Sequence, residues 1–221
     1  MIKVAPSILS ADFGRMADAV GDIQRWGADI VHCDVMDGVY VPNITFGMPM
    51  VKALRRYTSL PLDVHLMITR PEKYVGQFCD AGADWVTFHP EASEDVAGAL
   101  AEIKSKGVRT GLVVNADQPF EIVENYLGDI DMLLIMTVQA GFGGQSFKEE
   151  CLEKVRRGQA LKEKHGYRYD IEIDGGVSPS NIARCKEAGA TIVVAGNAVF
   201  KAEDPAAAVR AKPVSYTHLT L

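Results

Sequence analysis

The sequence predicts an α/β fold, a single-domain (β/α)8 or TIM barrel, and three observations lead to this prediction. Short β-branched runs alternate with longer amphipathic segments along almost the whole chain, which is typical of repeated βα units. Eight such units fit into 221 residues, at the lower end of the size range of this fold and with no room for a second domain. An internal repeat has the period of paired βα units. The competing architecture, a doubly wound sheet, needs a switch point and usually has fewer strands.

The elements follow in order along the chain. The predicted strands are Val4–Ile8, Ile30–Asp34, Leu62–Met67, Trp85–Phe88, Thr110–Val114, Met132–Met136, Ile171–Asp174 and Ile192–Ala195. Amphipathic patterns between them predict helices near 10–25, 49–57, 71–81, 94–106, 119–126, 147–165 and 180–188, and a last one that starts near Pro205. Residues that favour helix starts stand at the beginning of several patterns, namely Ser10, Pro71, Pro119 and Ser180.

The repeat joins a helix end to a strand in Trp26-Gly-Ala-Asp-Ile-Val, Ala81-Gly-Ala-Asp-Trp-Val and Ala188-Gly-Ala-Thr-Ile-Val. We expect Gly27, Gly82 and Gly189 to adopt the left-handed conformation that ends a helix. Gly128 falls near the position of a further copy, so the second, fourth, sixth and eighth strands share one entry motif.

Composition narrows the function classes. The chain is 48% apolar and 24% charged, and its net charge of −6 argues against binding to nucleic acid or to an anionic membrane. The run Met132–Met136 is too short to span a bilayer, and the N-terminal residues lack a signal sequence, so we expect a cytoplasmic protein. The four cysteines form no CxxC motif and are expected to be buried, reduced thiols.

Polar side chains stand at the ends of three predicted strands, where the active site of a barrel is built. His32 and Asp34 share one face of their strand, because strand side chains alternate with period two. His65 lies on the next strand and Asp174 ends the seventh. Imidazole and carboxylate ligands suit one divalent ion, and zinc, iron, manganese and cobalt all remain open.

Other residues near these strand ends have more ordinary interpretations. Asp63 and Glu172 lie two positions earlier on their strands, so we interpret them as structural partners that support the ligands from below. Asp37 precedes a glycine and fits a turn. Methionine is usually core filler, but three methionines at one end of the barrel are candidates for an apolar wall of the site: Met36, Met67 and Met136.

Glycine-rich turns follow the last three strands. They are Gly141-Phe142-Gly143-Gly144, Gly175-Gly176 and Gly196-Asn197. Glycine lets backbone N–H groups approach an anion closely, and these loops are a recurrent phosphate site in barrels. The sequence therefore predicts a phosphate-binding site that needs no basic surface, although the turns are also consistent with tight βα connections.

A divalent ion beside a phosphate site indicates a small phosphorylated substrate. One carboxylate can remove a proton next to a carbonyl that the ion polarises, through a metal-stabilised enediolate. Asp34 and Asp174 come from opposite sides of the barrel, so the second carboxylate can return a proton to the other face and invert that carbon.

Five motifs in order resemble the ribulose-phosphate 3-epimerase family over about residues 2–211. They are Ala5-Pro-Ser-Ile-Leu-Ser-Ala-Asp-Phe13, His32-Cys-Asp-Val-Met-Asp-Gly38 through Val41-Pro-Asn43, Leu62-Asp-Val-His-Leu-Met67, Met136-Thr-Val138 with Gly141-Phe-Gly-Gly-Gln145, and Asp174-Gly-Gly-Val177. The resemblance implies interconversion of D-ribulose 5-phosphate and D-xylulose 5-phosphate in the pentose phosphate pathway.

The resemblance also implies residue roles. It makes His32, Asp34, His65 and Asp174 the metal ligands, with Asp34 as proton acceptor and Asp174 as proton donor. It adds Ser7 and His65 as substrate contacts and assigns the phosphate to the glycine turns. Relatives of this kind commonly assemble into dimers or hexamers, so a homo-oligomer is expected.

The chain departs from the family pattern in three places. Gln139-Ala140 stands where Asn-Pro or Glu-Pro is expected, and Asn197 occupies a position often held by serine. Residues 212–221 have no helical period after Pro213, so we interpret residues 1–211 as the sugar-phosphate barrel and this tail as a cloning or sequencing remnant.

Three alternative functions are open on sequence grounds. A sister epimerase for a six-carbon ketose phosphate, such as D-allulose 6-phosphate, would share the same chemistry. A metal-dependent hydrolase on the same barrel would use its ion to activate water, and usually has more histidines than these two. A sugar-phosphate-binding barrel without catalysis is the third.

Overall fold

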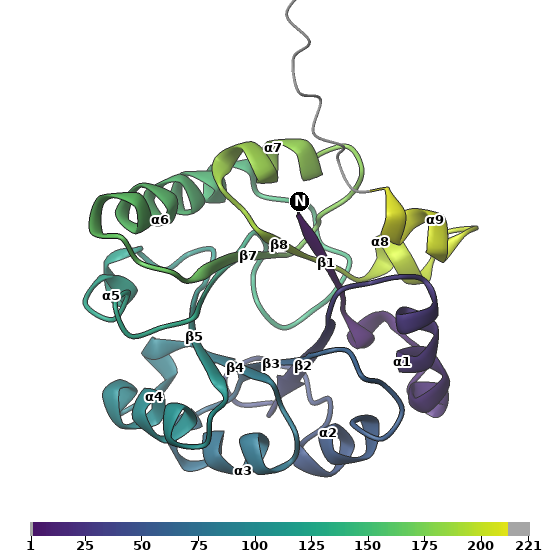
Figure 1. Ribbon diagram of the computed structural model, residues 1–221, viewed down its shortest axis with the longest axis horizontal. Helices are drawn as coiled ribbons and strands as arrows, with labels where there is room; N and C mark the ends of the chain where they lie inside the picture. The colour runs from purple at the N-terminus through teal and green to yellow at the C-terminus, as the bar shows by residue number, and fades with distance from the viewer. Residues whose placement is uncertain (1, 212–221) are drawn as a thin grey trace, which may run out of the picture.

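The computed structural model describes residues 2–211, so the C-terminal tail interpreted above lies outside the described residues. Within this range eight parallel strands curl into a barrel in the order β1-β8-β7-β6-β5-β4-β3-β2 (Figure 1). The predicted TIM barrel is confirmed. The strands are β1 (Lys3–Pro6), β2 (Val31–Met36), β3 (Leu62–Met67), β4 (Trp85–Phe88), β5 (Arg109–Val114), β6 (Met132–Met136), β7 (Asp170–Asp174) and β8 (Ile192–Ala195).

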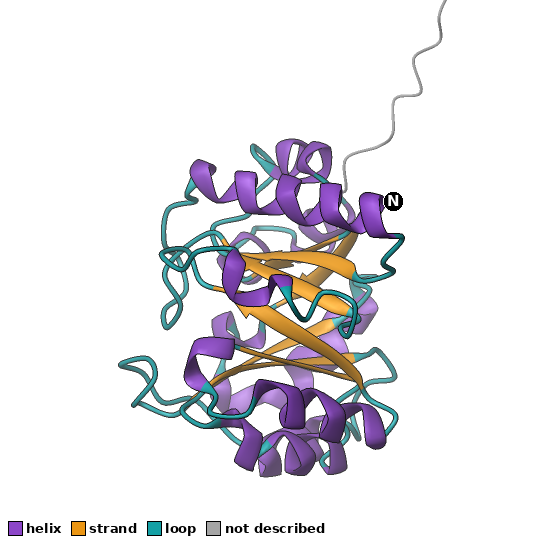
Figure 2. Ribbon diagram, turned by 90° about the vertical axis from the view of Figure 1, so that its left-hand side faces the viewer, coloured by secondary structure: helices purple, strands orange, loops and turns teal. Residues whose placement is uncertain are grey.

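Helices surround the strands, and Figure 2 shows the strands enclosed between helices above and below. They are α1 (Met16–Arg25), α2 (Met48–Leu54), α3 (Val75–Asp80), α4 (Val96–Ser105), α5 (Glu121–Glu124), α6 (Leu152–His165), α7 (Ile182–Ala188), α8 (Asn197–Phe200) and α9 (Pro205–Arg210). Short 3-10 helices cover Ile8–Ser10, Phe13–Arg15, Pro71–Lys73, Pro90–Ala92 and Glu149–Cys151. Every predicted strand is present, and helix α8 is an element that the sequence patterns did not predict.

The barrel closes where β1 meets β2. Ser7 and His32 form a parallel bridge there, and the Asp29 amide donates to the Val4 carbonyl at 3.1 Å. The Asp29 carboxylate also accepts from the Val4 amide at 2.8 Å. Closure matters for the site, because it places Ser7, at the end of β1, beside the polar residues of β2.

The glycines of the sequence repeat differ in backbone conformation. Gly27, Gly82 and Gly189 have φ angles of 82°, 105° and 116°, which confirms the left-handed helix ends. Gly128 is not among the described glycines with positive φ, so the extension of the same motif to this position is wrong. The predicted state of the cysteines is confirmed, since Cys33, Cys79, Cys151 and Cys185 are buried and free.

The core has an outer and an inner part. Apolar residues of the strands and helices fill the space between them, and a smaller apolar cluster that includes Trp85 and Met132 closes the N-terminal end of the barrel. Another cluster, with Met36, Met67 and Met136, lies at the C-terminal end. Buried polar side chains on the strands include His32, Asp34, His65 and Glu172.

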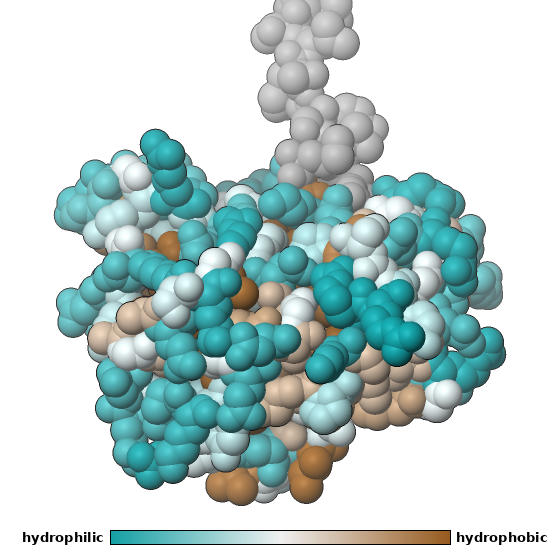
Figure 3. Space-filling model, turned by 60° about the horizontal axis from the view of Figure 1, so that its bottom comes forward, coloured by the Kyte–Doolittle hydropathy of each residue, from teal (hydrophilic) through white to brown (hydrophobic). Residues whose placement is uncertain are grey.

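The outer surface is ordinary for a globular domain. On the face shown in Figure 3, hydrophilic residues predominate and hydrophobic residues occur in small groups. Among the described residues no helix has both the length and the apolar character to cross a membrane.

Candidate active site and metal centre

The four predicted metal ligands lie together at the C-terminal end of the barrel. One nitrogen or oxygen from each of His32, Asp34, His65 and Asp174 lies within 4.8 Å of those from the others. Asp34 Oδ1 is 3.3 Å from both His32 Nε2 and His65 Nδ1. Asp174 Oδ2 is 4.0 Å from His32 Nε2 and 3.9 Å from His65 Nδ1. The four side chains therefore converge on one small volume.

The two histidines fit a cation at this point. Both side chains are fully buried, and among the described residues neither His32 Nε2 nor His65 Nδ1 has a hydrogen-bond partner. Buried polar atoms are normally hydrogen-bonded, so two unsatisfied imidazole nitrogens beside two carboxylate oxygens need an explanation. A divalent ion that accepts their lone pairs supplies it, and two imidazoles with two carboxylates form a suitable donor set.

Neighbouring strands position these ligands. On β2 and β3, Asp34 is the register partner of His65, and His32 is the register partner of Asp63. These two pairs of side chains therefore point into the barrel together. Asp63 Oδ2 lies 2.6 Å from His32 Nδ1, which leaves Nε2 to face the centre. This contact fits the interpretation of Asp63 as a supporting partner of His32. The Ser7 hydroxyl donates to Asp34 Oδ2, so the other oxygen of Asp34 is the one that faces the histidines.

The two aspartates have opposite pKa shifts. Burial by itself raises the pKa of Asp34, but the close approach of the His32 and His65 imidazoles outweighs it, so the pKa lies well below its ordinary value. Burial and, next, the negative charge of Asp34 raise the pKa of Asp174 to about 7. Near neutral pH one carboxyl group is therefore ionised while the other can carry a proton, which is the division expected of a base and an acid.

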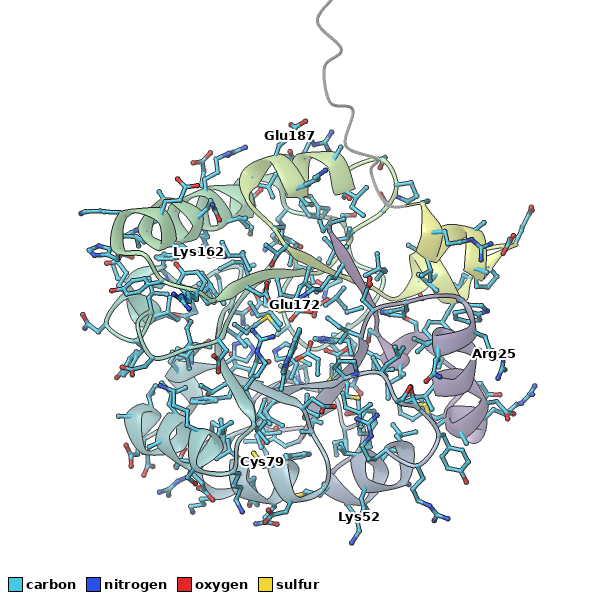
Figure 4. All side chains as sticks on the ribbon, viewed as in Figure 1. Arg25, Lys52, Cys79, Lys162, Glu172 and Glu187 are labelled. Carbon is cyan, nitrogen blue, oxygen red and sulfur yellow. The ribbon has the colours of Figure 1, made fainter. Side chains whose placement is uncertain are left out.

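Glu172 lies deeper in the barrel, as expected. Figure 4 shows it inside the ring of strands, whereas Arg25 and Lys52 project from the outer helices. Its Oε1 is 3.8 Å from His32 Nδ1, and within residues 2–211 neither of its oxygens has a hydrogen-bond partner. Burial and the charge of Asp63 raise the pKa of Glu172 well above its usual value. Glu172 and Asp63 thus form a polar layer beneath the four candidate ligands, against the Nδ1 side of His32.

A cavity of about 270 Å³ opens above the centre. Most of the residues predicted for the site line it, whereas His32 and His65 are fully buried. Among the described residues no lysine or arginine lines the cavity. The predicted residues that line it are Ser7, Asp34, Met36, Met67, Met136, Gly141, Phe142, Gly143, Gly144, Asp174, Gly175, Gly176, Gly196 and Asn197.

The glycine turns lie side by side at one edge of this cavity. A Cβ on Gly144 would be 2.7 Å from Asn197 Nδ2, so the loops after β6 and β8 meet there. A Cβ on Gly176, whose φ is 65°, would be 2.7 Å from the amide nitrogen of Phe147. Glycine is therefore required at Gly176 both for its backbone conformation and for the close approach of two loops.

The structure adds a residue that the sequence reasoning missed. His89 follows β4 directly, is fully buried, and its Nε2 lies 2.9 Å from His65 Nε2. The period of two that singled out the other residues also puts His89 on the inward face, with Trp85 and Thr87. Asp37, in contrast, is a turn residue as expected, because its carboxylate accepts from the amides of Val39 and Tyr40.

The fold and the site define a class: a TIM-barrel enzyme with a candidate His/Asp metal centre beneath a glycine-lined cavity. Comparison with known families gives the assignment within this class. The model of the Ribulose-phosphate 3 epimerase family matches residues 3–200, and the chain belongs to that family. It is an isomerase.

Curated relatives named ribulose-phosphate 3-epimerase support the assignment over most of the chain. The Bacillus subtilis protein is 45% identical over 205 residues, which cover 92% of this chain and 94% of the relative. The Synechocystis protein is 47% identical over 210 residues, with 94% and 91% covered. The Escherichia coli protein is 44% identical over 202 residues, with 91% and 90% covered.

Solved structures share the fold at low sequence identity. KGPDC from Streptococcus mutans superposes with a TM-score of 0.74 at 15% identity, covering 96% of this chain and 95% of the other. A 3-hexulose-6-phosphate synthase superposes with a TM-score of 0.69 at 18% identity, covering 95% and 97%. At these identities the comparison establishes the barrel and nothing about the reaction.

Proposed function

We propose that this protein interconverts D-ribulose 5-phosphate and D-xylulose 5-phosphate by moving a proton at C3. One observation carries the proposal. Asp34 on β2 and Asp174 on β7 approach the same two histidines, His32 and His65. The names of the curated relatives support the choice of substrate. Family membership favours an epimerase over the hydrolase and the non-catalytic barrel.

The two carboxyl groups act on opposite faces of the substrate. In the direction from ribulose to xylulose, the ionised Asp34 accepts the C3 proton, and Asp174 delivers a proton to the other face. The roles reverse in the other direction, because each group then holds the proton state that the reverse step needs. Ser7 fixes Asp34 by donating to Oδ2, so Oδ1 stays turned toward the site.

His32, Asp34, His65 and Asp174 would hold one divalent ion, which can be zinc, iron, manganese or cobalt. When bound, such an ion polarises the C2 carbonyl and stabilises the negative charge that develops as the C3 proton leaves. Asp63 keeps His32 in the orientation that turns Nε2 toward the ligand group.

The cavity binds the rest of the substrate. Backbone amides of the turns at 141–144, 175–176 and 196–197 contact the phosphate, since no cationic side chain among the described residues lines the cavity. Met36, Met67 and Met136 form the apolar side of the same cavity and exclude water from the reacting carbon. Residues 1–211 form the catalytic unit in this proposal, and a homo-oligomer stays a prediction.

Asparagine variants in deuterated water test the two-base mechanism. Asp174→Asn and Asp34→Asn should each lower epimerisation by about 10²–10⁴-fold, the usual contribution of a general acid or base. With Asp174→Asn, D-ribulose 5-phosphate should still take up deuterium at C3 through Asp34 and remain D-ribulose 5-phosphate. With Asp34→Asn, the same one-sided exchange should occur in D-xylulose 5-phosphate. NMR of the recovered sugars measures both.

Asp95→Asn is the matched control. Asp95 caps α4 outside the barrel by accepting from the Gly98 amide, and asparagine caps a helix as well as aspartate does. This variant should epimerise at the parental rate. Near-normal epimerisation by either active-site variant would contradict the mechanism. It would also be contradicted if, in each variant, deuterium exchange at C3 were lost equally from D-ribulose 5-phosphate and D-xylulose 5-phosphate. Comparing turnover of D-ribulose 5-phosphate with that of D-allulose 6-phosphate decides between the five-carbon and six-carbon substrates.

A further inference from the structure

His89 is a fully buried imidazole that the proposed mechanism does not use. It lies immediately after β4 and next to His65, with 5.1 Å between the ring centroids and 2.9 Å between the two Nε2 atoms. At that distance one of the two nitrogens carries the proton and the other accepts it. The direction of this hydrogen bond decides whether His65 carries its proton on Nε2, which leaves a lone pair on Nδ1, or on Nδ1.

The geometry around His65 sets that direction. Its Nδ1 faces Asp34 and Asp174 at 3.3 and 3.9 Å, on the side where the four candidate ligands converge. For Nδ1 to offer a lone pair to a cation, the ring proton must sit on Nε2. His65 Nε2 then donates to His89 Nε2, and the proton of His89 must be on its Nδ1.

The surroundings of His89 fit this tautomer. His89 Nδ1 has no hydrogen-bond partner among the described residues, but it lies 3.4 Å from the Glu91 carboxylate, whose negative charge favours an N–H over a lone pair at this nitrogen. Glu91 in turn accepts from the Tyr40 hydroxyl at 2.7 Å, and the ring of Tyr40 packs on His89 with 4.8 Å between the centroids. The hydrogen bond between His65 and His89, the charge of Glu91 and the hydroxyl of Tyr40 therefore all favour a His89 ring with its proton on Nδ1.

We propose that His89 is a positioning residue for the metal centre: it accepts the Nε2 proton of His65 and so fixes the tautomer that turns the Nδ1 lone pair toward the ion. Glu91, held by the Tyr40 hydroxyl, favours the His89 tautomer with its proton on Nδ1 through its negative charge. This inference rests on the proposed function in assuming that a divalent ion binds here. Tyr40 follows β2 and Glu91 follows β4, so two loops at the rim support a ligand buried inside the barrel.

Two substitutions of His89 separate positioning from packing. His89→Gln keeps an acceptor for the His65 proton, whereas His89→Phe fills a similar volume with no acceptor. Zinc affinity is measured by competition with a chromophoric chelator, which requires no catalysis. His89→Phe should weaken zinc binding by about 10–100-fold, the usual effect of removing a partner of a metal-bound histidine, and His89→Gln should stay within about threefold of the parent.

Two substitutions of Glu91 provide a second test in case a substitution at the fully buried His89 prevents folding. Glu91→Leu removes the acceptor that faces His89 Nδ1, and Glu91→Gln retains a carbonyl oxygen there. We expect Glu91→Leu to weaken zinc binding by about tenfold and Glu91→Gln to leave it nearly unchanged. Glu94→Gln, which alters an exposed ion pair with Arg70 nearby, is the control and should match the parent.

NMR of the histidine nitrogens reads the tautomer directly. In the zinc-loaded protein, His89 should carry its proton on Nδ1, and a coupling should cross the hydrogen bond between the two Nε2 atoms. A His89 proton on Nε2 would overturn the inference, and so would zinc affinity that is equal in His89→Phe and His89→Gln. If the parent protein epimerises its substrate and binds zinc, and His89→Phe binds zinc equally well, this inference alone is refuted. If the parent protein neither epimerises nor binds zinc, the proposed function is refuted as well.

Discussion

Gly176 offers a sharp test of the loop arrangement at the cavity. Its φ is 65°, and a Cβ there would lie 2.7 Å from Phe147 N, 2.9 Å from Phe147 Cα and 3.0 Å from Gln145 O. These are backbone atoms, so a side chain at Gly176 cannot be relieved by a rotamer change. Gly166, at the end of α6, has a nearly equal φ of 69°, and a Cβ there would meet nothing within 4 Å.

Gly166→Ala and Gly176→Ala therefore carry the same cost of placing alanine in a left-handed conformation, and only Gly176→Ala adds a steric clash with backbone atoms. A left-handed residue with a Cβ costs about 1–2 kcal/mol, part of which is offset because alanine restricts the unfolded chain more than glycine does. Gly166→Ala should accordingly lose about 1 kcal/mol in the free energy of unfolding. Gly176→Ala adds the cost of overpacking, about 1–3 kcal/mol, and should lose about 2–4 kcal/mol in all.

Function should separate the variants further. Gly176→Ala pushes the segment around Gln145 and Phe147 away from the turn after β7, which deforms the proposed phosphate site. The KM for the sugar phosphate should rise by about tenfold or more, equivalent to about 1.4 kcal/mol, whereas Gly166→Ala should keep the parental KM. Denaturant unfolding and steady-state kinetics measure the two effects. Equal stability of the two variants together with an unchanged KM would refute the reasoning.

Three further predictions concern pH, metal and salt. Burial raises the pKa of Asp37, but hydrogen bonds from the backbone amides of Thr69, Val39 and Tyr40 outweigh it and lower that pKa. The ionised carboxylate therefore stabilises the folded protein above the unfolded pKa of about 4, and this stabilisation is lost as pH falls through the folded pKa. Asp37→Asn should therefore destabilise the protein by about 1 kcal/mol at neutral pH and by less in acid, as measured by unfolding at each pH. Removal of divalent ions by a chelator should abolish epimerisation, and adding back zinc, iron, manganese or cobalt singly should restore it; full activity in metal-free protein would contradict the metal centre. Because no Lys or Arg among residues 2–211 lines the cavity, KM should stay constant or fall as salt rises from about 0.01 M to about 0.1 M, and a KM that increases severalfold would indicate a cationic phosphate site.

Much of the site could be predicted because strand geometry is local. A period of two puts His32 with Asp34 on one face, and the barrel brings the ends of β2, β3 and β7 to the same edge. The same period continues past the end of β4 to His89, which lies one residue beyond the predicted strand and therefore outside the strand ends considered. Helix α8 was missed for another reason, since four residues are too few to show a helical period.

The sequence by itself determined the barrel, the four converging side chains and the glycine turns, because periodicity and turn chemistry are properties of short segments. Tertiary structure decided which atoms face one another: Ser7 on Asp34, Asp63 on His32, and His89 on His65. These pairs join residues from different strands. Their geometry depends on barrel closure and on side-chain rotamers, which no short segment specifies.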